Sequence, residues 1–404
     1  KTLGLGMNGG RISGGVSLEN LGGGADVSEF AEGLALESNF NPGFGGGMYV
    51  RRGAVVRDCT FTDNFASDGG GAYVQAPTSG SRAEIAGCVF ERNFAFGEGG
   101  GASGEATFNG CQFYANEATF GGGLFGDGLM VNCAVAGNGA YLDGGGAFFD
   151  GDVSNCTIVA NRSGRSGGGL QANPSGVGIV GNCVLTMNQA GLSGDNLSGS
   201  YLQIAFSIVE GGLGDVDGVA GVDYIDDQNL DIDPGFVAPP DDGGDGFGDV
   251  VTTPDVDEGA HDFLGDLRLA LGSPAIDAGN NFVLPLDDND ADGDGRTLEP
   301  IPFDLDGNDR IVDDPMTVDT GFVGDGEGVA GVDIGAYEFQ PSPGGSPCPA
   351  DLAAPMGVLN FDDVLAFLTA FGAMESAADL AVPFGEINFD DILAFLVAFG
   401  EGCP

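Results

Sequence analysis

The sequence predicts a mainly β protein: a parallel β-helix, which is a solenoid of stacked coils, followed by a small α-helical domain. Three observations lead to this prediction. A short motif recurs six times, Gly triplets follow it at a nearly constant distance, and an apolar unit is duplicated near the C-terminus. Gly accounts for 77 of 404 residues, yet 42% of the chain is hydrophobic, which fits many short strands joined by tight turns rather than a disordered chain.

The recurring motif reads Cys, any residue, an apolar residue, two further residues and Asn. Successive copies begin 29, 23, 22, 23 and 27 residues apart, which is too short for a propeller blade and matches one coil of a β-helix. A weaker copy runs from Leu34 to Asn39, and another begins at Ser207. The six full copies are Cys59–Asn64, Cys88–Asn93, Cys111–Asn116, Cys133–Asn138, Cys156–Asn161 and Cys183–Asn188.

In each motif the Cys and the apolar residue are two positions apart, so both side chains face the interior from one strand. Stacked coils then place Cys above Cys and Asn above Asn, about 4.8 Å apart, where Asn side chains can hydrogen-bond one another. Disulfides or metal ligation are alternative roles for the Cys residues. We expect buried free thiols, because parallel stacking is poor disulfide geometry and no Cys pair has metal-site spacing.

Gly triplets lie five or six residues after most of these Asn residues, and each precedes an apolar strand. Gly permits a sharp corner in which no side chain would fit. Each triplet therefore marks a corner of one coil. The triplets are Gly45–Gly47, Gly69–Gly71, Gly99–Gly101, Gly121–Gly123, Gly144–Gly146 and Gly167–Gly169.

The repeats resemble those of the polymorphic outer-membrane proteins over roughly residues 30–210. The resemblance lies in Phe-x-x-Asn steps such as Phe61 to Asn64, and in Gly-Gly-Ala steps such as Gly70 to Ala72. It implies a right-handed, single-stranded parallel β-helix of the kind found on bacterial surfaces and associated with adhesion. We assign residues 1–210 to this solenoid.

Between residues 211 and 339 the repeat fades and Asp becomes frequent. One stretch fits the D-x-D-x-D-G pattern of a calcium loop, in which alternate carboxylates converge at a turn on Gly293 and a later Glu completes the ligand shell. Pro285 and Pro300 flank it, so the two helices of an EF-hand are not expected. We expect Ca²⁺ here, with a plain acidic turn as the alternative. The candidate ligands are Asp288, Asp290, Asp292, Asp294 and Glu299.

A second acidic loop offers Asp304 and Asp306 as further candidate metal ligands. Together with residues 272–280 and 332–338, this loop resembles the choice-of-anchor Q segment, which closes β-helical bacterial surface proteins ahead of exchangeable C-terminal anchors. The resemblance implies no reaction. It implies that three side chains pack onto the last coil of the solenoid: Ile276, Ile334 and Tyr337.

A linker-like stretch, residues 340–347, precedes a duplicated unit at residues 348–404 whose copies are offset by 28. In each copy, Asn followed by Asp-Asp can start a helix, and two such helices can pack together. Cys348 and Cys403 bracket the pair, and in an oxidising compartment a disulfide between them would stabilise the domain by roughly 4 kcal/mol. The apolar face of the first helix comprises Val364, Phe367, Leu368 and Phe371.

This duplicated unit resembles a GC-type dockerin, in which paired calcium loop–helix units hold a cohesin-like anchoring protein. The resemblance implies bound Ca²⁺ and such a partner. The sequence departs from dockerin loops, because apolar residues and Pro occupy the third and fifth loop positions. An Asp N-cap with a Pro–Gly turn and no metal is therefore the alternative. The residues that match the loops are Asp351, Asn360, Asp363, Asp379, Asn388 and Asp391.

The charge of the chain limits its partners. Lys and Arg total 12 while Asp and Glu total 61, which gives a formal net charge of −49. Nucleic acids and anionic membrane surfaces are therefore poor partners, and no apolar run is long enough for membrane insertion. The chain begins within repeat-like sequence without a signal peptide, which suggests a mature or truncated product.

Catalysis is not expected from this sequence. The sole His, His261, lies outside the repeats, Trp is absent, and nothing pairs the two carboxylates that glycosidase chemistry needs. The leading hypothesis is a secreted or cell-surface structural or adhesive protein held through its C-terminal module, with glycans as further candidate partners. One alternative is a head-to-tail filament subunit that binds other copies of itself. The other is a polysaccharide lyase or glycoside hydrolase.

Overall fold

The chain forms two compact units. One comprises residues 1–312 with 319–338, and the other comprises residues 313–318 with 339–404. The computed structural model describes residues 11–19, 25–77, 82–172, 178–199, 202–212, 216–217, 223–224, 228–241, 263–287, 295–315, 317–323, 330–341, 361–373 and 389–401.

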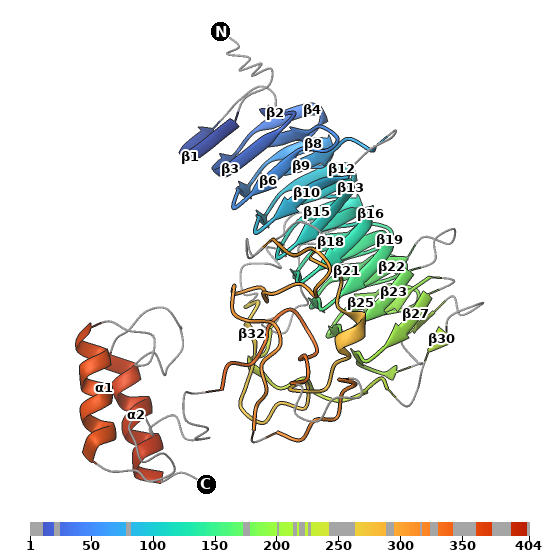
Figure 1. The fold of residues 1–404 in the computed structure, drawn as a ribbon. Helices are drawn as coiled ribbons and strands as arrows, with labels where there is room; N and C mark the ends of the chain where they lie inside the picture. The colour runs from blue at the N-terminus through green and yellow to red at the C-terminus, as the bar shows by residue number, and fades with distance from the viewer. Residues whose placement is uncertain are drawn as a thin grey trace. The chain divides into compact units, whose positions relative to one another are not determined.

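The first unit contains a right-handed parallel β-solenoid in which three columns of strands repeat from coil to coil (Figure 1). Strands of the first column follow the ladder Cys residues and pair in parallel, so that Phe61, Phe90 and Phe113 lie opposite one another. The column starts at Leu36 on β3 (Phe30–Glu37), with which β1 (Arg11–Glu19) also pairs. Its other strands are β7 (Thr60–Thr62), β11 (Val89–Glu91), β14 (Gln112–Tyr114), β17 (Ala134–Ala136), β20 (Thr157–Val159), β24 (Val184–Thr186) and β28 (Ile208–Val209).

The second column begins directly after the ladder Asn residues and forms a separate parallel sheet. Its first positions place Phe40, Phe65 and Phe94 opposite one another. In the strands from β8 to β21 the following residue, such as Ala66, is buried, so the first position faces outward. The strands are β4 (Phe40–Phe44), β8 (Phe65–Asp68), β12 (Phe94–Glu98), β15 (Glu117–Phe120), β18 (Gly139–Ala140), β21 (Arg162–Ser163) and β25 (Gln189–Ala190).

The third column follows the Gly corner. Gly69 has a φ of 65°, and a Cβ there would come within 2.3 Å of the Ala72 carbonyl oxygen, so the corner excludes a side chain. In the middle coils this column is a single eight-residue strand, and elsewhere it splits into two shorter strands. The strands are β2 (Ala25–Val27), β5 (Met48–Val50), β6 (Val55–Arg57), β9 (Ala72–Val74), β10 (Ala83–Ala86), β13 (Ala102–Asn109), β16 (Leu124–Val131), β19 (Ala147–Ser154), β22 (Leu170–Ala172), β23 (Gly178–Gly181), β26 (Leu197–Ser198), β27 (Leu202–Ala205), β29 (Val216–Asp217) and β30 (Asp223–Tyr224).

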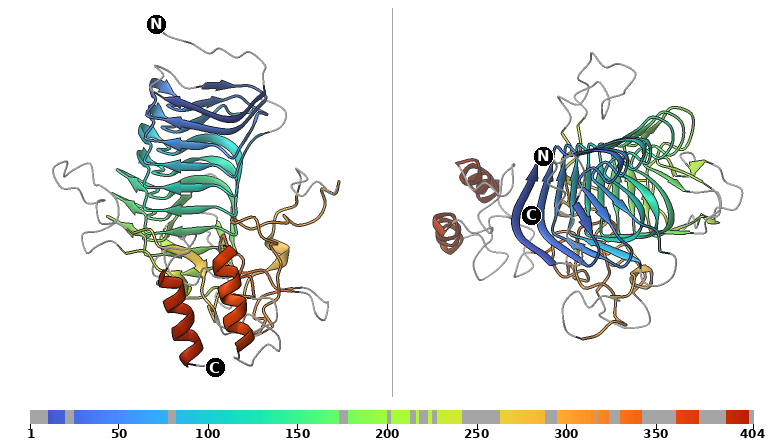
Figure 2. Two further views of the ribbon diagram at one scale, coloured as in Figure 1. Left: turned by 90° about the vertical axis from the view of Figure 1, so that its left-hand side faces the viewer. Right: turned by 90° about the horizontal axis from the view of Figure 1, so that it is seen from above.

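One continuous apolar core fills the solenoid from Val27 to Val209. The rings of Phe61, Phe90 and Phe113 stack inside it with centroids 4.6 and 4.8 Å apart. Because every coil places apolar side chains at the same interior positions, each coil buries its apolar face only against its neighbours. Figure 2 shows the coils lying over one another from two further sides. The Phe positions continue in later coils as Val135, Ile158, Leu185 and Val209.

A side segment of the first unit, described at residues 263–287, 295–312, 319–323 and 330–338, runs beside the middle coils of the solenoid (Figure 1). It contains β32 (Asp266–Leu269), which pairs antiparallel with β31 (Phe236–Ala238), and the 3-10 helix η3 (Asn281–Val283). The side chain of Tyr337 lies close enough to Tyr114 on β14 for each phenol to shift the pKa of the other. The prediction that Tyr337 packs onto the last coil is therefore wrong, because the segment docks along the flank of the solenoid.

The second unit contains two helices, α1 (Phe361–Ala373) and α2 (Phe389–Glu401). The buried rings of Phe367 and Phe395 stack with centroids 4.2 Å apart and join the helices. Leu368, which the sequence analysis places on the packed face, is 54% exposed. One neighbouring helix covers only a narrow stripe, which Phe367 already occupies.

Candidate functional site

The ladder Asn residues form one buried column inside the solenoid. The backbone N–H and the Nδ2 of Asn93 both donate to Asn116 Oδ1, at 2.9 and 3.0 Å, and Asn116 Nδ2 donates to the Phe90 carbonyl at 2.8 Å. Because each side-chain amide hydrogen-bonds groups in the adjacent coils, the column holds the coils in register. The same side-chain bond links Asn39, Asn64, Asn93, Asn116, Asn138, Asn161 and Asn188 in order.

The ladder Cys residues are free and buried in a second interior column: Cys59, Cys88, Cys111, Cys133, Cys156 and Cys183. Their thiols donate to backbone carbonyls, as Cys111 Sγ does to Ile85 O at 3.3 Å. Burial raises the pKa of the Cys111 and Cys156 thiols well above the ordinary value. A thiol that is buried and kept protonated is a small apolar side chain rather than a nucleophile.

Another Asn column, which the sequence analysis did not identify, binds the side segment. Asn132 Nδ2 donates to Phe303 O at 2.7 Å, and Asn155 Nδ2 donates to Asp333 O at 3.2 Å. Each of these Asn residues directly precedes a ladder Cys and has a positive φ near 50°, a conformation that Asn adopts more readily than most residues. The corresponding residues of three earlier coils are Asp58, Gly87 and Gly110.

The side segment buries one cation. The Arg310 guanidinium donates from Nη1 to the Ala336 carbonyl at 3.0 Å, and its Nε lies 3.9 Å from Glu338 Oε2. Burial, followed by the nearby Asp333, raises the pKa of Glu338 well above its ordinary value, against the opposing effect of Arg310. Arg310 thus ties the segment together internally and is not offered to a ligand.

The structure describes three of the seven candidate calcium ligands in the acidic region. Glu299 Oε2 lies 3.4 Å from Arg296 Nη1, and the Asp304 carboxylate accepts the N–H of Asn308 at 2.7 Å and that of Glu338 at 2.9 Å. Burial and the nearby Asp304 raise the pKa of Asp306. The described residues do not bring these three carboxylates together around one point. The other candidates, which lie outside the described residues, are Asp288, Asp290, Asp292 and Asp294.

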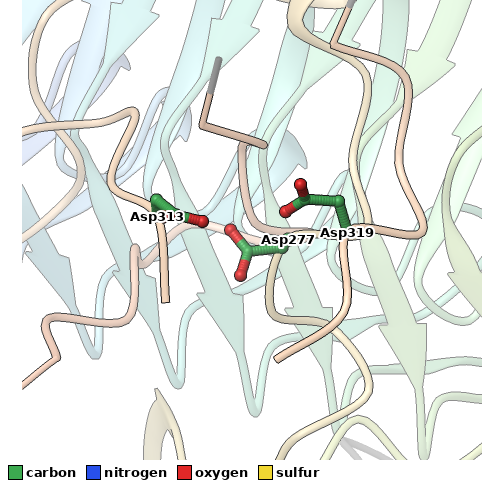
Figure 3. A group of neighbouring side chains, drawn as sticks. All are labelled: Asp277, Asp313 and Asp319. Atoms are coloured by element: carbon green, nitrogen blue, oxygen red, sulfur yellow. The ribbon is translucent and has the colours of Figure 1, made fainter. Parts of the chain in front are cut away.

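A different group of carboxylates does lie together, as Figure 3 shows. One oxygen from each of Asp277, Asp313 and Asp319 lies within 4.8 Å of the others; Asp277 is buried and the other two are exposed. Asp277 also donates its backbone N–H to Asp333 Oδ1 at 2.8 Å. Acidic groups of this kind are common without an ion, so the cluster by itself identifies no metal.

The candidate residues of the C-terminal module are mostly outside the described residues. Asp363 and Asp391 belong to the first turns of α1 and α2, and the structure does not describe their side chains. The predicted disulfide between Cys348 and Cys403 also lies outside the described residues. So do the remaining loop candidates, Asp351, Asn360, Asp379 and Asn388.

An aromatic patch lies on the outer face of the second column and the adjoining corner. The rings of Phe40, Phe65 and Phe94 stack with centroids 5.2 Å apart at each step. The ring of Phe96 packs nearly perpendicular to those of Phe65 and Phe94. The ring centroids of Phe44 and Tyr73 lie 4.5 Å apart. Phe96, Phe40 and Phe44 are 65%, 53% and 48% exposed, so much of this aromatic surface faces solvent. A signal for it exists in the sequence, because Phe directly follows Asn39, Asn64 and Asn93.

Two carboxylates lie on the same strands as this patch. Asp68 on β8 is opposite Phe44 of β4, and its Oδ1 accepts the backbone N–H of Glu98 at 2.9 Å. A Cβ at Gly97 would come within 2.2 Å of that oxygen, so Gly97 leaves the space that Asp68 occupies. Burial and the neighbouring Asp68 raise the pKa of Glu98. This pair therefore places negative charge at the edge of an aromatic surface.

A third acidic feature is a ladder on the outer face of the third column. Glu105, Asp127 and Asp150 lie opposite one another on β13, β16 and β19. Arg82 pairs with Glu105 at 2.8 Å and lies 3.9 Å from Asp127. Burial, followed by Glu105, raises the pKa of Asp127, which Arg82 opposes.

These features define a parallel β-helix protein, and comparison with known proteins gives the same fold. The family described as "Right handed beta helix region" matches residues 15–207. The predicted fold class is thus confirmed. Searches of curated proteins and of solved structures found no match. Within the described ranges, no helix is long and apolar enough to cross a membrane.

Proposed function

We propose that this chain is a structural or adhesive protein displayed outside the cell. The observation that supports it best is the Asn ladder, in which seven side chains in register are used to stack the coils. The interior therefore serves rigidity, and the side chains able to bind or react lie on the outer faces. Stacked coils repeat these outer side chains about every 4.8 Å, which suits multivalent contact with a surface.

Protease treatment of intact producing cells tests the display. Peptides from the solenoid should appear in the medium while a cytoplasmic marker protein stays intact. Release of solenoid peptides only after lysis would contradict extracellular display. Light scattering of the purified chain across concentrations separates a monomer from the head-to-tail filament.

The C-terminal helices supply a candidate anchoring surface. Leu365 and Leu368 of α1 are both 54% exposed, and their counterparts in the second copy, Leu393 and Leu396, are 50% and 56% exposed. Exposed apolar side chains grouped in this way mark binding surfaces. We propose that these leucines contact a cohesin-like anchoring protein and that Ca²⁺ orders the loops before the helices.

Two measurements test the anchoring proposal. Binding to a cohesin-type domain should fall at least tenfold in the double variant Leu368→Ser, Leu396→Ser, and should be unchanged in Leu192→Ser, which alters a residue of the solenoid unit that is 74% exposed. Metal analysis with a thermal melt before and after chelation tests calcium. A chain that contains no calcium and melts identically after chelation would refute the calcium proposal. The proposed anchoring surface is tested separately by the binding assay.

A polysaccharide-acting enzyme is the second candidate, and one observation favours it. Asp127 combines a raised pKa with two carboxylate neighbours in register, Glu105 and Asp150, which is the kind of environment that separates a general acid from a carboxylate base. A panel of neutral and acidic polysaccharides provides the test. Turnover that Asp127→Asn abolishes and Asp152→Asn leaves intact would replace the structural proposal; no turnover would exclude this site.

A further inference from the structure

The stacked rings of the aromatic patch cover one another's faces, and the ring of Phe96 protrudes beside them. The faces of Phe40, Phe65 and Phe94 are turned toward one another along the stack, with interplanar angles of 20° and 9°. Sugar rings stack on open aromatic faces, whereas aliphatic side chains of a protein pack well against edges and between protruding rings. The geometry of the stack therefore favours a protein partner over a glycan.

The two carboxylates beside the patch differ from neighbouring carboxylates in their ion pairing. On the same coils Arg92 pairs with Asp63 at 3.0 Å, and Arg57 pairs with Glu84 at 2.9 Å. Within the part of the chain that the structure describes, no Arg or Lys forms an ion pair with Asp68 or Glu98. These two carboxylates adjoin each other at the patch without a cation, so a partner that supplied one would relieve their repulsion.

The chain itself is a poor occupant of this surface. Its net charge of −49 opposes the approach of a second copy to a patch that already carries two carboxylates. The aromatic rings would also attract a cation, as Arg51 shows by lying 5.7 Å from the ring of Tyr49 beside the patch. Charge and ring chemistry thus require the same partner: apolar at its centre and basic at its rim.

We propose that the aromatic patch and the Asp68–Glu98 pair form a docking surface for a protein segment that presents aliphatic side chains flanked by Lys or Arg. This inference rests on the proposed adhesive role and names the surface through which it acts. Phe96, the most exposed ring of the patch, is the central contact, and Glu98 supplies the charge. The surface lies on β4, β8 and β12, near the N-terminal end of the solenoid (Figure 1).

Direct binding to the full chain tests the proposal, with EDTA present so that metal ions do not fill the carboxylate pair. The probe is a synthetic peptide of alternating Leu and Lys, compared with a Leu and Glu peptide and with glucosamine oligomers, which carry the same cation on a sugar. Titration calorimetry should show binding of the Leu–Lys peptide alone. Phe96→Ser should weaken it by about tenfold or more, and Glu98→Gln should weaken it by a smaller factor that disappears at high salt.

Matched controls separate the patch from bulk charge and bulk hydrophobicity. Leu192→Ser removes an apolar side chain that is 74% exposed, and Asp152→Asn removes an exposed carboxylate on β19, away from the patch. Both should bind the Leu–Lys peptide as the unmodified chain does. Phe40→Ser provides a second patch variant should Phe96→Ser fail to fold.

Three results would overturn the proposal: no binding of the Leu–Lys peptide, equal losses in the control and patch variants, or tighter binding of the glucosamine oligomers. None of these results bears on extracellular display, which the protease experiment measures separately. Failure of the patch and failure of the proposed function are therefore distinguishable.

Discussion

Asn182 and Asn280 exchange two hydrogen bonds across 98 residues of sequence. The backbone N–H of Asn280 donates to Asn182 Oδ1 at 2.8 Å, and Asn182 Nδ2 donates to the Asn280 carbonyl at 3.0 Å. The amide of Asn182 thus pairs with both backbone groups of Asn280, as an adjacent strand would. Through this pairing the irregular side segment is attached to the regular solenoid.

Asn182→Gly should loosen the side segment without distorting the solenoid. Gly accepts the positive φ of 52° at this position, so the substitution removes the side-chain bonds and leaves the backbone unstrained. We expect a loss of about 2 kcal/mol in unfolding free energy, because two partly buried backbone groups of Asn280 lose their partners. Limited proteolysis should cut the side segment sooner than in the unmodified chain.

Asp58→Gly is the matched control for that experiment. Asp58 occupies the same position of an earlier coil with a φ of 50°, and no described residue of the side segment hydrogen-bonds its backbone. Its unfolding free energy should change by less than about 0.5 kcal/mol. If the two variants lost equal stability, the side-segment contacts of Asn182 would contribute nothing specific.

The regular features of the molecule could be read from the sequence because they repeat. A stacked column appears in the sequence as one residue type that recurs at a nearly constant period. The Asn column at positions 93, 116 and 138 could therefore be predicted from its spacing alone. The contact of Asn182 with Asn280 has no such signature, since the side segment does not repeat and its partner is a single backbone position. The same reasoning applies to Tyr337, which the sequence analysis placed on the last coil.

The sequence analysis also did not predict which side chains lie together on the outer surface, for a different reason. Phe61 and Phe65 are both aromatic and lie four positions apart, yet the first is buried and the second lies on the outer face. The corner at Asn64 reverses the inward and outward positions between the two columns, so strand alternation alone does not extend across it. The pairing of Asp68 with Glu98 depends on the register of that second column.

Asn116→Ala should destabilise the solenoid more than any surface substitution. Removal of its side chain leaves the backbone N–H of Asn93 and the carbonyl of Phe90 buried without partners. We expect a loss of about 3–5 kcal/mol in unfolding free energy, measured by denaturant titration. Asn41→Ala is the control, because the bonds of Asn41 stay within its own turn, and it should cost less than about 1 kcal/mol.

The six ladder thiols should resist labelling in the native protein. Burial shields all six thiols from the reagent, and it raises the pKa of Cys111 and Cys156, so the reactive thiolate of these two is scarce at neutral pH. Mass spectrometry after treatment with an alkylating reagent should find these Cys residues unmodified until denaturant is added. Glu37→Cys, an exposed position, should label at once and shows that the reagent is active. Rapid native labelling of Cys111 would show that the column opens.

Tyr114 and Tyr337 should make the solenoid unit sensitive to alkali. Burial is the main cause that raises the pKa of Tyr114 from 10 to about 12, and it also raises the pKa of the neighbouring Tyr337. A raised pKa means that the folded state keeps a proton that the unfolded state releases above pH 10. The stability contributed by Tyr114 is therefore fully present below pH 10 and is lost as the pH rises through about 12, by roughly 1.4 kcal/mol for each pH unit between these two values.

Tyr114→Phe separates this titration from the general effect of alkali on an acidic chain. At neutral pH the unfolding free energy of the variant should change by less than about 1 kcal/mol, because the Phe ring fills the same position beside Tyr337. Above pH 10 its unfolding free energy should fall less steeply than that of the unmodified chain, because one phenol no longer resists ionisation. Denaturant titrations at several pH values give both quantities, and ultraviolet titration of the phenols in the native state should show one fewer late-ionising Tyr. Equal slopes for the two proteins would mean that Tyr114 ionises freely in the folded state and that its contact with the side segment opens before the solenoid unfolds.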